Sequence, residues 1–169
     1  MQLEVVIQDI LKKEGDAIIR DLQSAMASTG ANASGRTSQS LLNEVSSSGI
    51  SRATMLITGG VGWQFVEQGR RKTENNGNGE LKGIIKQWMI DKGVTIPEGY
   101  TLESFAFVVT RSIHRRGTKL NYTKTRRDIY TSVINEERIN SITAQVTKTF
   151  IANATSDVVT ALKNKLWSH

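Results

Sequence analysis

Side chains that commonly catalyse reactions are scarce in this sequence. It has no cysteine and two histidines, His114 and His169. A Cys–His pair is therefore impossible, a Ser–His–Asp triad would have to use one of these two histidines, and a zinc site would need mostly carboxylate ligands. The acidic residues show no spacing typical of an acid–base pair. We therefore expect no enzymatic activity, no metal site and no cofactor.

The positive charge of the chain is concentrated in one segment. The net charge is +6, from 22 basic and 16 acidic residues. Residues 111–127, the basic segment, contain no acidic residue and seven basic ones: Arg111, Arg115, Arg116, Lys119, Lys124, Arg126 and Arg127. Close cations repel one another unless a partner neutralises them. That partner could be DNA phosphates or an acidic protein surface, or the segment could be a solvated face; we favour docking to protein.

A second candidate is the aromatic segment, residues 61–69, which contains Trp63, Phe65 and Glu67. An aromatic side chain beside a carboxylate can pack and pair across a joint between subunits. The alternative is that both aromatic side chains lie in the core and that Glu67 is a solvated charge.

The loop after the aromatic segment, residues 70–79, is basic at its start and rich in Asn and Gly. Arg70, Arg71 and Lys72 could meet an acidic surface, or the loop could be a plain exposed connection. His114 lies near the end of an expected helix, where a hydrogen bond at the helix end is the simplest role for its ring.

The spacing of apolar residues predicts four helical regions: residues 3–27, 80–92, 101–116, and from about Arg127 onward. In the second region one face holds Leu81, Ile84, Ile85, Trp88 and Met89. Thr101 is expected to cap the third region. The last region is expected to break near Asn135 or Asn153. Its apolar stripe, residues 139–166, could pack on its own domain or on a neighbouring subunit.

Between the first two helices the sequence predicts a short helix and a strand. Thr37 or Ser38 could cap the short helix, which residues 46–49 would end. Residues 50–58 alternate loosely between apolar and polar side chains, as expected of a strand. After the third helix, residues 118–126 are expected to form an extended basic arm.

These elements together predict an α+β fold with an N-terminal helix, a small antiparallel sheet, two central helices and a long C-terminal helix. We expect an α+β domain over residues 1–127 and a helical extension over 128–169 that packs on this domain or on a neighbouring subunit. No apolar run approaches the roughly 20 residues that span a bilayer, and the N-terminus lacks the pattern of a signal peptide. We therefore expect a protein made in the cytoplasm, with no membrane partner.

Three motifs follow one another along the first part of the chain: GRTSQSL at 35–41, VGWQFVEQGR at 61–70 and IHRRGTK at 113–119. They resemble, in order, Thr-Gly-Arg-Leu-x-x-Ser, Tyr-Ala-x-x-Val-Glu-x-Gly-Thr and Ile-x-x-x-Gly-Thr elements of the tail-completion family of tailed bacteriophages. The resemblance covers about residues 1–135.

The resemblance implies a structural virion protein that is assembled in the host cytoplasm. Such proteins form a ring at the head–tail interface, between portal or adaptor proteins and the tail, and DNA passes through without specific binding. A closed ring needs two different matching patches, which we predict at residues 61–69 and 111–127. The predicted interface residues are Trp63, Phe65, Glu67, Arg70, Arg71, Arg115, Arg116, Lys119, Arg126 and Arg127. A basic nucleic-acid-binding module is the alternative function.

Overall fold

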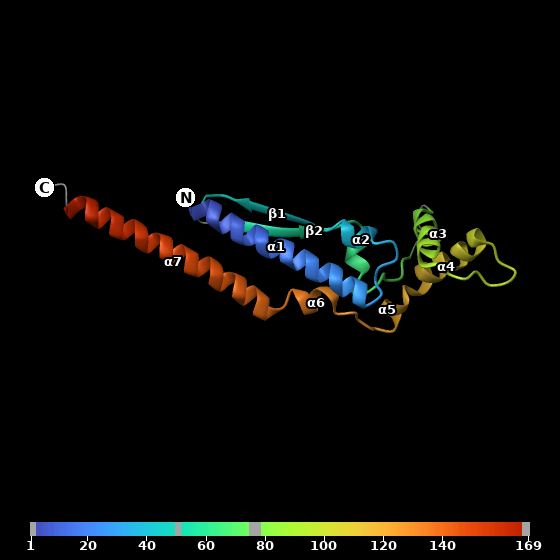
Figure 1. Ribbon diagram of the computed structural model, residues 1–169. Coiled ribbons are helices and arrows are strands. Elements are labelled where there is room, and N and C mark those ends of the chain that lie inside the picture. Colours follow the sequence, from blue (N-terminus) through green and yellow to red (C-terminus); the bar gives the residue numbers. More distant parts are fainter. Residues whose placement is uncertain (1–2, 50–51, 75–78, 167–169) are drawn as a thin grey trace. The chain divides into compact units, whose positions relative to one another are not determined.

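The computed structural model describes residues 3–49, 52–74 and 79–166 (Figure 1). Its elements are, in chain order, α1 (Leu3–Ser28), α2 (Arg36–Gln39), β1 (Leu42–Ser47), β2 (Ala53–Thr58), the 3-10 helix η1 (Trp63–Phe65), α3 (Glu80–Lys92), α4 (Leu102–Arg116), α5 (Lys119–Tyr122), α6 (Ile129–Val133) and α7 (Glu136–Leu166). The predicted α+β fold, with its N-terminal helix, small antiparallel sheet and long C-terminal helix, is confirmed. Among the described residues, no helix is apolar over a length that could cross a bilayer.

Contacts within the chain group it into two compact units. Unit 1 comprises residues 1–21, 42–58 and 131–169, and unit 2 comprises residues 22–41 and 59–130. The predicted boundary at residue 127 divides the chain into two consecutive stretches. Each compact unit instead combines segments that are separated in the sequence.

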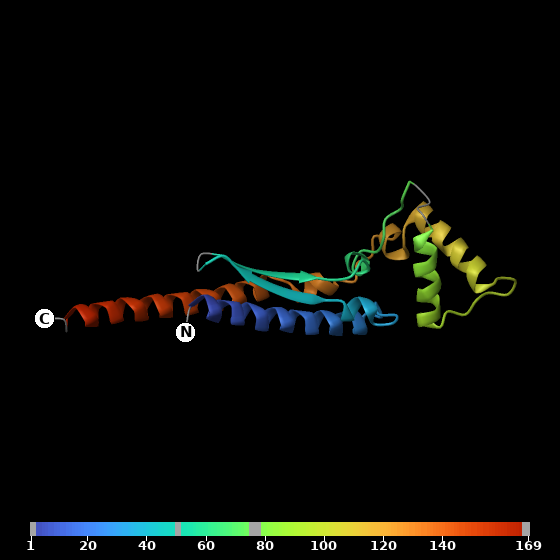
Figure 2. The same ribbon diagram turned by 90° about the horizontal axis from the view of Figure 1, so that it is seen from above.

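In unit 1 the hairpin of β1 and β2 runs along the N-terminal part of α1, as Figures 1 and 2 both show. The antiparallel register runs from Leu42 opposite Thr58 to Ser47 opposite Ala53. Side chains of β1 alternate between exposed and half-buried. The buried apolar side chains of this unit come from α1: Ile7, Leu11 and Ile18.

Gly15 lies within α1 and faces Asn43 of β1. A Cβ atom at Gly15 would lie 2.3 Å from Asn43 Oδ1. Asn43 Nδ2 donates hydrogen bonds to the Lys12 carbonyl at 2.9 Å and to Asp16 Oδ1 at 3.0 Å. A glycine weakens a helix interior, but here it leaves the space in which the strand's side chain reaches the helix backbone.

The short helix after α1 is smaller than the sequence predicts. It ends at Gln39, and its N-cap is Gly35, with φ 81°, rather than Thr37 or Ser38. Ser38 Oγ donates instead to the Gly35 carbonyl at 2.8 Å. The predicted end of this helix at residues 46–49 is therefore wrong, because the helix has ended by Gln39 and β1 begins at Leu42.

The strand β1 is the element that the sequence pattern missed. Its polar residues give little apolar alternation, so its conformation depends on pairing with β2 rather than on local preference. The predicted strand at 50–58 is confirmed for Ala53–Thr58, while residues 50–51 lie outside the described ranges.

The C-terminal helix α7 begins after a break at residues 134–135. Asn135 Oδ1 accepts a hydrogen bond from the Arg138 N–H at 2.9 Å, which is the contact of an N-cap. The break predicted near Asn135 is thus confirmed. α7 then continues to Leu166 without interruption, so there is no break at Asn153.

Within unit 1, α7 meets α1 through polar contacts. Arg138 Nη1 lies 2.6 Å from Asp21 Oδ2, and Gln145 Nε2 donates to Glu14 Oε1 at 3.2 Å. No side chain of α7 is buried. The helix is therefore held near its start, and its apolar side chains are not enclosed by the rest of unit 1.

Unit 2 has a core assembled from several segments. Its buried apolar side chains are Leu22, Met26, Leu41, Val66, Met89, Ala106 and Ile129. The predicted cap of α4 is confirmed: Thr101 Oγ1 accepts from the Ser104 N–H at 3.1 Å, and Ser104 Oγ accepts from the Thr101 N–H at 2.9 Å. These reciprocal bonds fix where α4 starts.

An exposed salt-bridge group joins α3 to α4. Lys82 Nζ lies 2.7 Å from Glu103 Oε1, and Lys86 Nζ lies 2.6 Å from Glu103 Oε2. Hydrogen bonds from these two lysines lower the pKa of Glu103 to about 2. The carboxylate therefore stays charged down to strongly acidic pH.

Candidate functional site

The candidate residues of unit 2 are organised around Glu67, which follows η1. Its side chain is fully buried. Glu67 Oε1 accepts a hydrogen bond from Arg126 Nη2 at 2.5 Å, and Oε2 accepts one from the Tyr130 N–H at 2.9 Å. The Glu67 carbonyl accepts from the Arg127 N–H at 3.2 Å. The aromatic segment and the end of the basic segment therefore meet at this residue.

The Glu67–Arg126 pair is asymmetric in its exposure. The Glu67 side chain is 0% exposed, whereas the Arg126 side chain is 49% exposed. The hydrogen bond that Arg126 donates to Glu67 raises the pKa of Arg126 above its ordinary value. Burial raises the pKa of the neighbouring Tyr130 hydroxyl. The interpretation of Glu67 as a solvated charge is wrong, because its carboxylate is satisfied inside unit 2 rather than offered to solvent.

Two glycines bring the second and third sequence motifs into contact. Gly69 has φ 72° and Gly117 has φ 84°. The Arg70 N–H donates to Thr118 Oγ1, and the Thr118 N–H donates to the Arg70 carbonyl, both at 2.9 Å. A Cβ atom at Gly69 would lie 2.1 Å from Thr118 Oγ1, and one at Gly117 would lie 2.8 Å from the Arg70 carbonyl oxygen. This close approach requires glycine at both positions.

His114 has the structural role that the sequence predicts. It is 6% exposed, near the end of α4. Its Nδ1 lies 2.5 Å from Thr73 Oγ1, and its carbonyl accepts from the Thr73 N–H at 2.8 Å. The ring thus ties the start of the 70–79 loop to α4. Residues 75–78 of that loop lie outside the described ranges.

The extended arm predicted at residues 118–126 is wrong in its first half. Residues from Lys119 to Tyr122 form α5. The Tyr122 N–H donates to the Thr118 carbonyl at 3.1 Å, and the Arg116 guanidinium lies 5.9 Å from the centroid of the Tyr122 ring. Local hydrogen bonding and this cation–π contact fold the segment despite its charge.

Several cations of this region border an open cavity of about 510 Å³. Arg70, Arg71 and Lys72 line it together with Phe65 and Tyr130. The Arg70 guanidinium lies 5.6 Å from the centroid of the Phe65 ring, which orients it without neutralising it. The cavity therefore presents positive charge next to aromatic surface.

The other predicted interface residues are spread over unit 2. Trp63 is half-buried, and its ring centroid lies 5.5 Å from that of Tyr130. Arg115 and Lys119 are exposed, and Arg127 is half-buried. The structure therefore brings together Phe65, Glu67, Arg70, Arg71 and Arg126. The cations of α4 and α5 lie at the side of this group.

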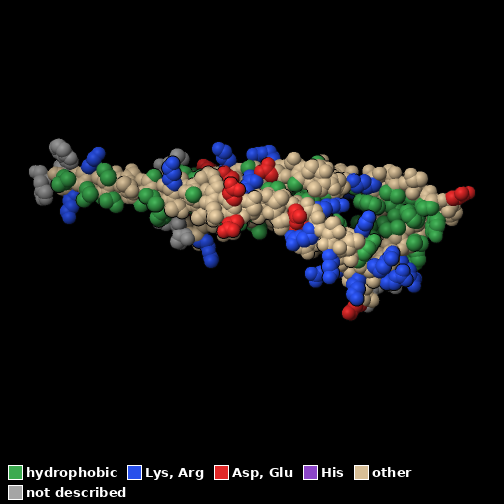
Figure 3. All heavy atoms as spheres, turned by 90° about the horizontal axis from the view of Figure 1, so that it is seen from below, with side chains coloured by type: hydrophobic (Ala, Val, Ile, Leu, Met, Phe, Trp, Pro, Cys, Tyr) green, Lys and Arg blue, Asp and Glu red, His purple; other side chains and the backbone are tan. Residues whose placement is uncertain are grey.

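Exposed apolar surface on α3 and α4 is a feature that sequence reasoning missed. The face predicted for α3 buries Met89, but Ile84 is 58% exposed and Trp88 is 42% exposed. Phe107 and Val108 of α4 are 52% and 45% exposed. Figure 3 shows hydrophobic side chains gathered over these helices, with basic side chains beside them. Helical spacing alone finds an apolar face but does not say whether the same chain covers it.

Comparisons with protein-family models, with curated proteins and with solved structures found no match. The resemblance to the tail-completion family thus stays a prediction. Among the residues that the structure describes, no group of three or more His, Cys, Asp or Glu side chains is placed to hold a metal ion. The site consists of an ion pair with a buried carboxylate, a tight backbone junction and exposed cations, a combination suited to binding.

Proposed function

We propose that this protein is a structural virion subunit of a tailed bacteriophage that forms a closed ring at the head–tail interface. The supporting observation is the junction of Arg70 with Thr118, which are 48 residues apart in the sequence. It joins the two motifs that resemble the family's Val-Glu-x-Gly and Gly-Thr elements. Motifs that share a structural purpose are expected to meet in space, as these do.

The proposed ring has protein partners and no cofactor. Its subunits contact one another and the neighbouring portal or adaptor and tail proteins, and DNA passes through the ring without specific binding. The subunit is made in the host cytoplasm, resides in the virion and has no enzymatic activity. Exposed cations and exposed apolar helices on the described surface supply the two kinds of contact that such an interface uses.

The ring can be tested with the purified full-length chain. Native mass spectrometry and negative-stain electron microscopy are expected to give one discrete, rotationally symmetric oligomer. Charge reversal at Arg71 or Lys119 is expected to weaken assembly, and the control charge reversal Glu44→Lys, at an exposed position of β1, is expected to leave it intact. If the chain stays monomeric at every concentration, both alone and when mixed with phage particles that lack this subunit, the proposed ring is excluded.

The cavity beside Arg70, Arg71 and Lys72 favours nucleic-acid binding as a second candidate function. Cations next to Phe65 and Tyr130 could hold phosphates and stack bases. Fluorescence anisotropy with single- and double-stranded DNA tests this function. Tight binding that weakens steeply with salt, and that Arg71→Glu abolishes, would favour it over the ring.

A further inference from the structure

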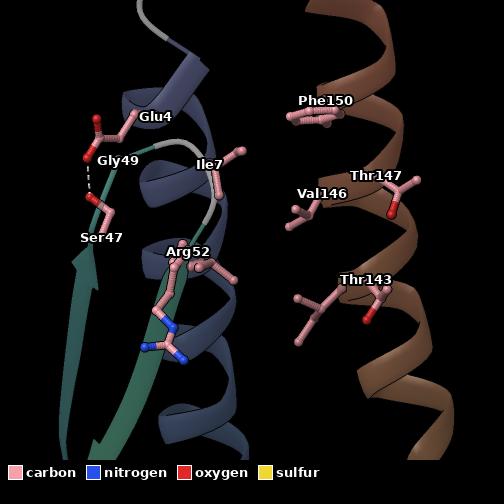
Figure 4. A pocket seen from close by; sticks show the side chains of 12 residues that line it. Glu4, Ile7, Ser47, Gly49, Arg52, Thr143, Val146, Thr147 and Phe150 are labelled. Atoms are coloured by element: carbon pink, nitrogen blue, oxygen red, sulfur yellow. Dashed lines mark hydrogen bonds between the residues drawn. The ribbon is translucent and has the colours of Figure 1, made fainter. Parts of the chain in front are cut away.

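The helix α7 carries two apolar faces, one after the other. The first belongs to its N-terminal half, where Ile142 and Val146 are half-buried. In unit 1 these side chains line one wall of an open cleft of about 360 Å³, and Ile7 and Leu11 of α1 line the other wall. Figure 4 shows Val146 and Phe150 on the side of α7 that faces α1, across open space.

The second face, the distal stripe, consists of Ile151, Val158, Leu162 and Leu166. Their exposed fractions are 58%, 59%, 56% and 76%. Spacings of seven and four residues place them on one side of the helix, over a length of about 22 Å. An apolar helix face of this length is expected to be buried in the working state of a protein.

The distal stripe does not continue the first face of α7. The positions that would extend the first face beyond Asn153 are Asp157, Thr160 and Asn164, which are polar. The apolar side therefore rotates to the opposite surface of the helix. In Figures 1 and 2, the C-terminal end of α7 also extends past the start of α1, so no element of unit 1 lies beside it. The described residues of unit 1 therefore offer no surface on which the stripe could be buried.

Charge favours the α1 surface of another copy as the place where the stripe is buried. Residues 148–166 of α7 contain three lysines and one aspartate, whereas residues 3–21 of α1 contain five acidic and three basic residues. A parallel pairing of two distal stripes would instead bring equivalent lysines near one another. Attraction between the basic end of α7 and the acidic surface of α1 therefore favours a heterologous contact, in which each copy contributes a different surface.

We propose that the distal stripe of α7 docks into the unit 1 cleft of a second copy of this chain. Leucine side chains from the arriving helix fill the space between Ile7, Leu11 and Val146, with Glu4 at the border. Such a contact uses two different patches, so repeated copies add head to tail and can close into a ring. The inference rests on the proposed ring and adds a contact between α7 and α1 to the subunit contacts predicted for the basic and aromatic segments of unit 2.

Because the chain has no cysteine, a pair of introduced cysteines can report this contact without background. Full-length Ala53→Cys, at the cleft, is mixed with full-length Leu162→Cys under mild oxidation. The mixture is expected to give at least about tenfold more disulfide-linked dimer than a mixture with Thr160→Cys, on the opposite side of α7. Dimers that form equally well from Leu162→Cys alone would show α7–α7 pairing and overturn the proposed contact.

A second variant separates this inference from the ring itself. Leu162 is exposed, so Leu162→Asp is expected to fold normally and to raise the concentration needed for assembly by at least about tenfold. The matched control Thr160→Asp is expected to assemble like the unaltered chain. If the unaltered chain forms rings and Leu162→Asp forms them equally well, the α7 contact is wrong and the ring stands. If the unaltered chain never assembles, both proposals fall.

Discussion

The two long helices α1 and α7 are built from similar proportions of apolar residues but have different surroundings. α1 has 26 residues and buries Ile7, Leu11, Ile18, Leu22 and Met26. α7 has 31 residues and buries none. Helix formation in proteins draws most of its stability from packing of an apolar face. The difference shows that packing within the chain stabilises α1, whereas most of the apolar surface of α7 remains exposed and is available for the contact that we propose.

The largest expected effect comes from removing a side chain that α1 buries. Leu22 is 0% exposed, and Leu22→Ala is expected to lower the free energy of unfolding by about 2–5 kcal/mol, from lost burial and the cavity left behind. Leu162→Ala in α7 is expected to change it by less than about 0.5 kcal/mol. Urea unfolding of the monomer at low concentration measures both, and equal losses would break the contrast between the helices.

The contrast between buried and exposed side chains also applies to charged groups, and the carboxylate of Glu67 is the buried example. Glu67→Ala removes the acceptor of the Tyr130 N–H and the partner of Arg126, and we expect a loss of about 1–3 kcal/mol in the free energy of unfolding. Glu103→Ala removes an exposed salt-bridge partner and should give a much smaller loss than Glu67→Ala in the same unfolding experiment. An unchanged stability of Glu67→Ala would show that the site does not hold unit 2 together.

A smaller effect is expected where α1 meets β1. Gly15→Ala should lower the free energy of unfolding by about 1 kcal/mol, because the new methyl group displaces Asn43 and its two hydrogen bonds. In a chain that already carries Asn43→Ala the same change should be stabilising by about 0.5–1 kcal/mol, since alanine favours the helix. A double-mutant cycle by thermal or urea unfolding checks this reversal of sign.

The smallest expected effect is the pH dependence of the α3–α4 salt bridges. The pKa of Glu103 is about 2 in the folded chain, below the ordinary value of 4.5. Its contribution to stability is therefore present above pH 4.5 and is lost as the pH falls toward 2. The difference in Tm between the unaltered chain and Glu103→Gln should shrink over that interval. Because the group is exposed, 1 M salt should remove the difference at neutral pH as well.

Local sequence signals predicted the elements whose evidence is local. Apolar spacing located α1, α3 and α4, and Thr101 marked the start of α4 through a cap made with its near neighbour Ser104. The strand β1 was missed because a partner strand, rather than its own residues, determines its conformation. A single sequence shows the periodicity of an element but not what lies opposite it.

The candidate site likewise has features that the sequence predicted and features that it did not. Residue types and spacing indicated the aromatic and basic segments, and two of the motifs contain Gly69 and Gly117, although their contact was not predicted. The burial of Glu67 and its pairing with Arg126 were not predicted, because these residues are 59 positions apart and neither has a local signal for the other. The exposure of the α7 stripe was equally hidden, since an apolar face looks the same whether its partner is the same chain or another.

The assignment of both ends of the chain to unit 1 has a consequence for synthesis on the ribosome. All segments of unit 2 have been made once Tyr130 has been added, whereas unit 1 still lacks α7 at that point. Domains generally fold as units while the chain is being made. We therefore expect unit 2 to be able to fold before the distal stripe of α7 leaves the ribosome, so that this apolar stripe is exposed only after unit 2 has formed.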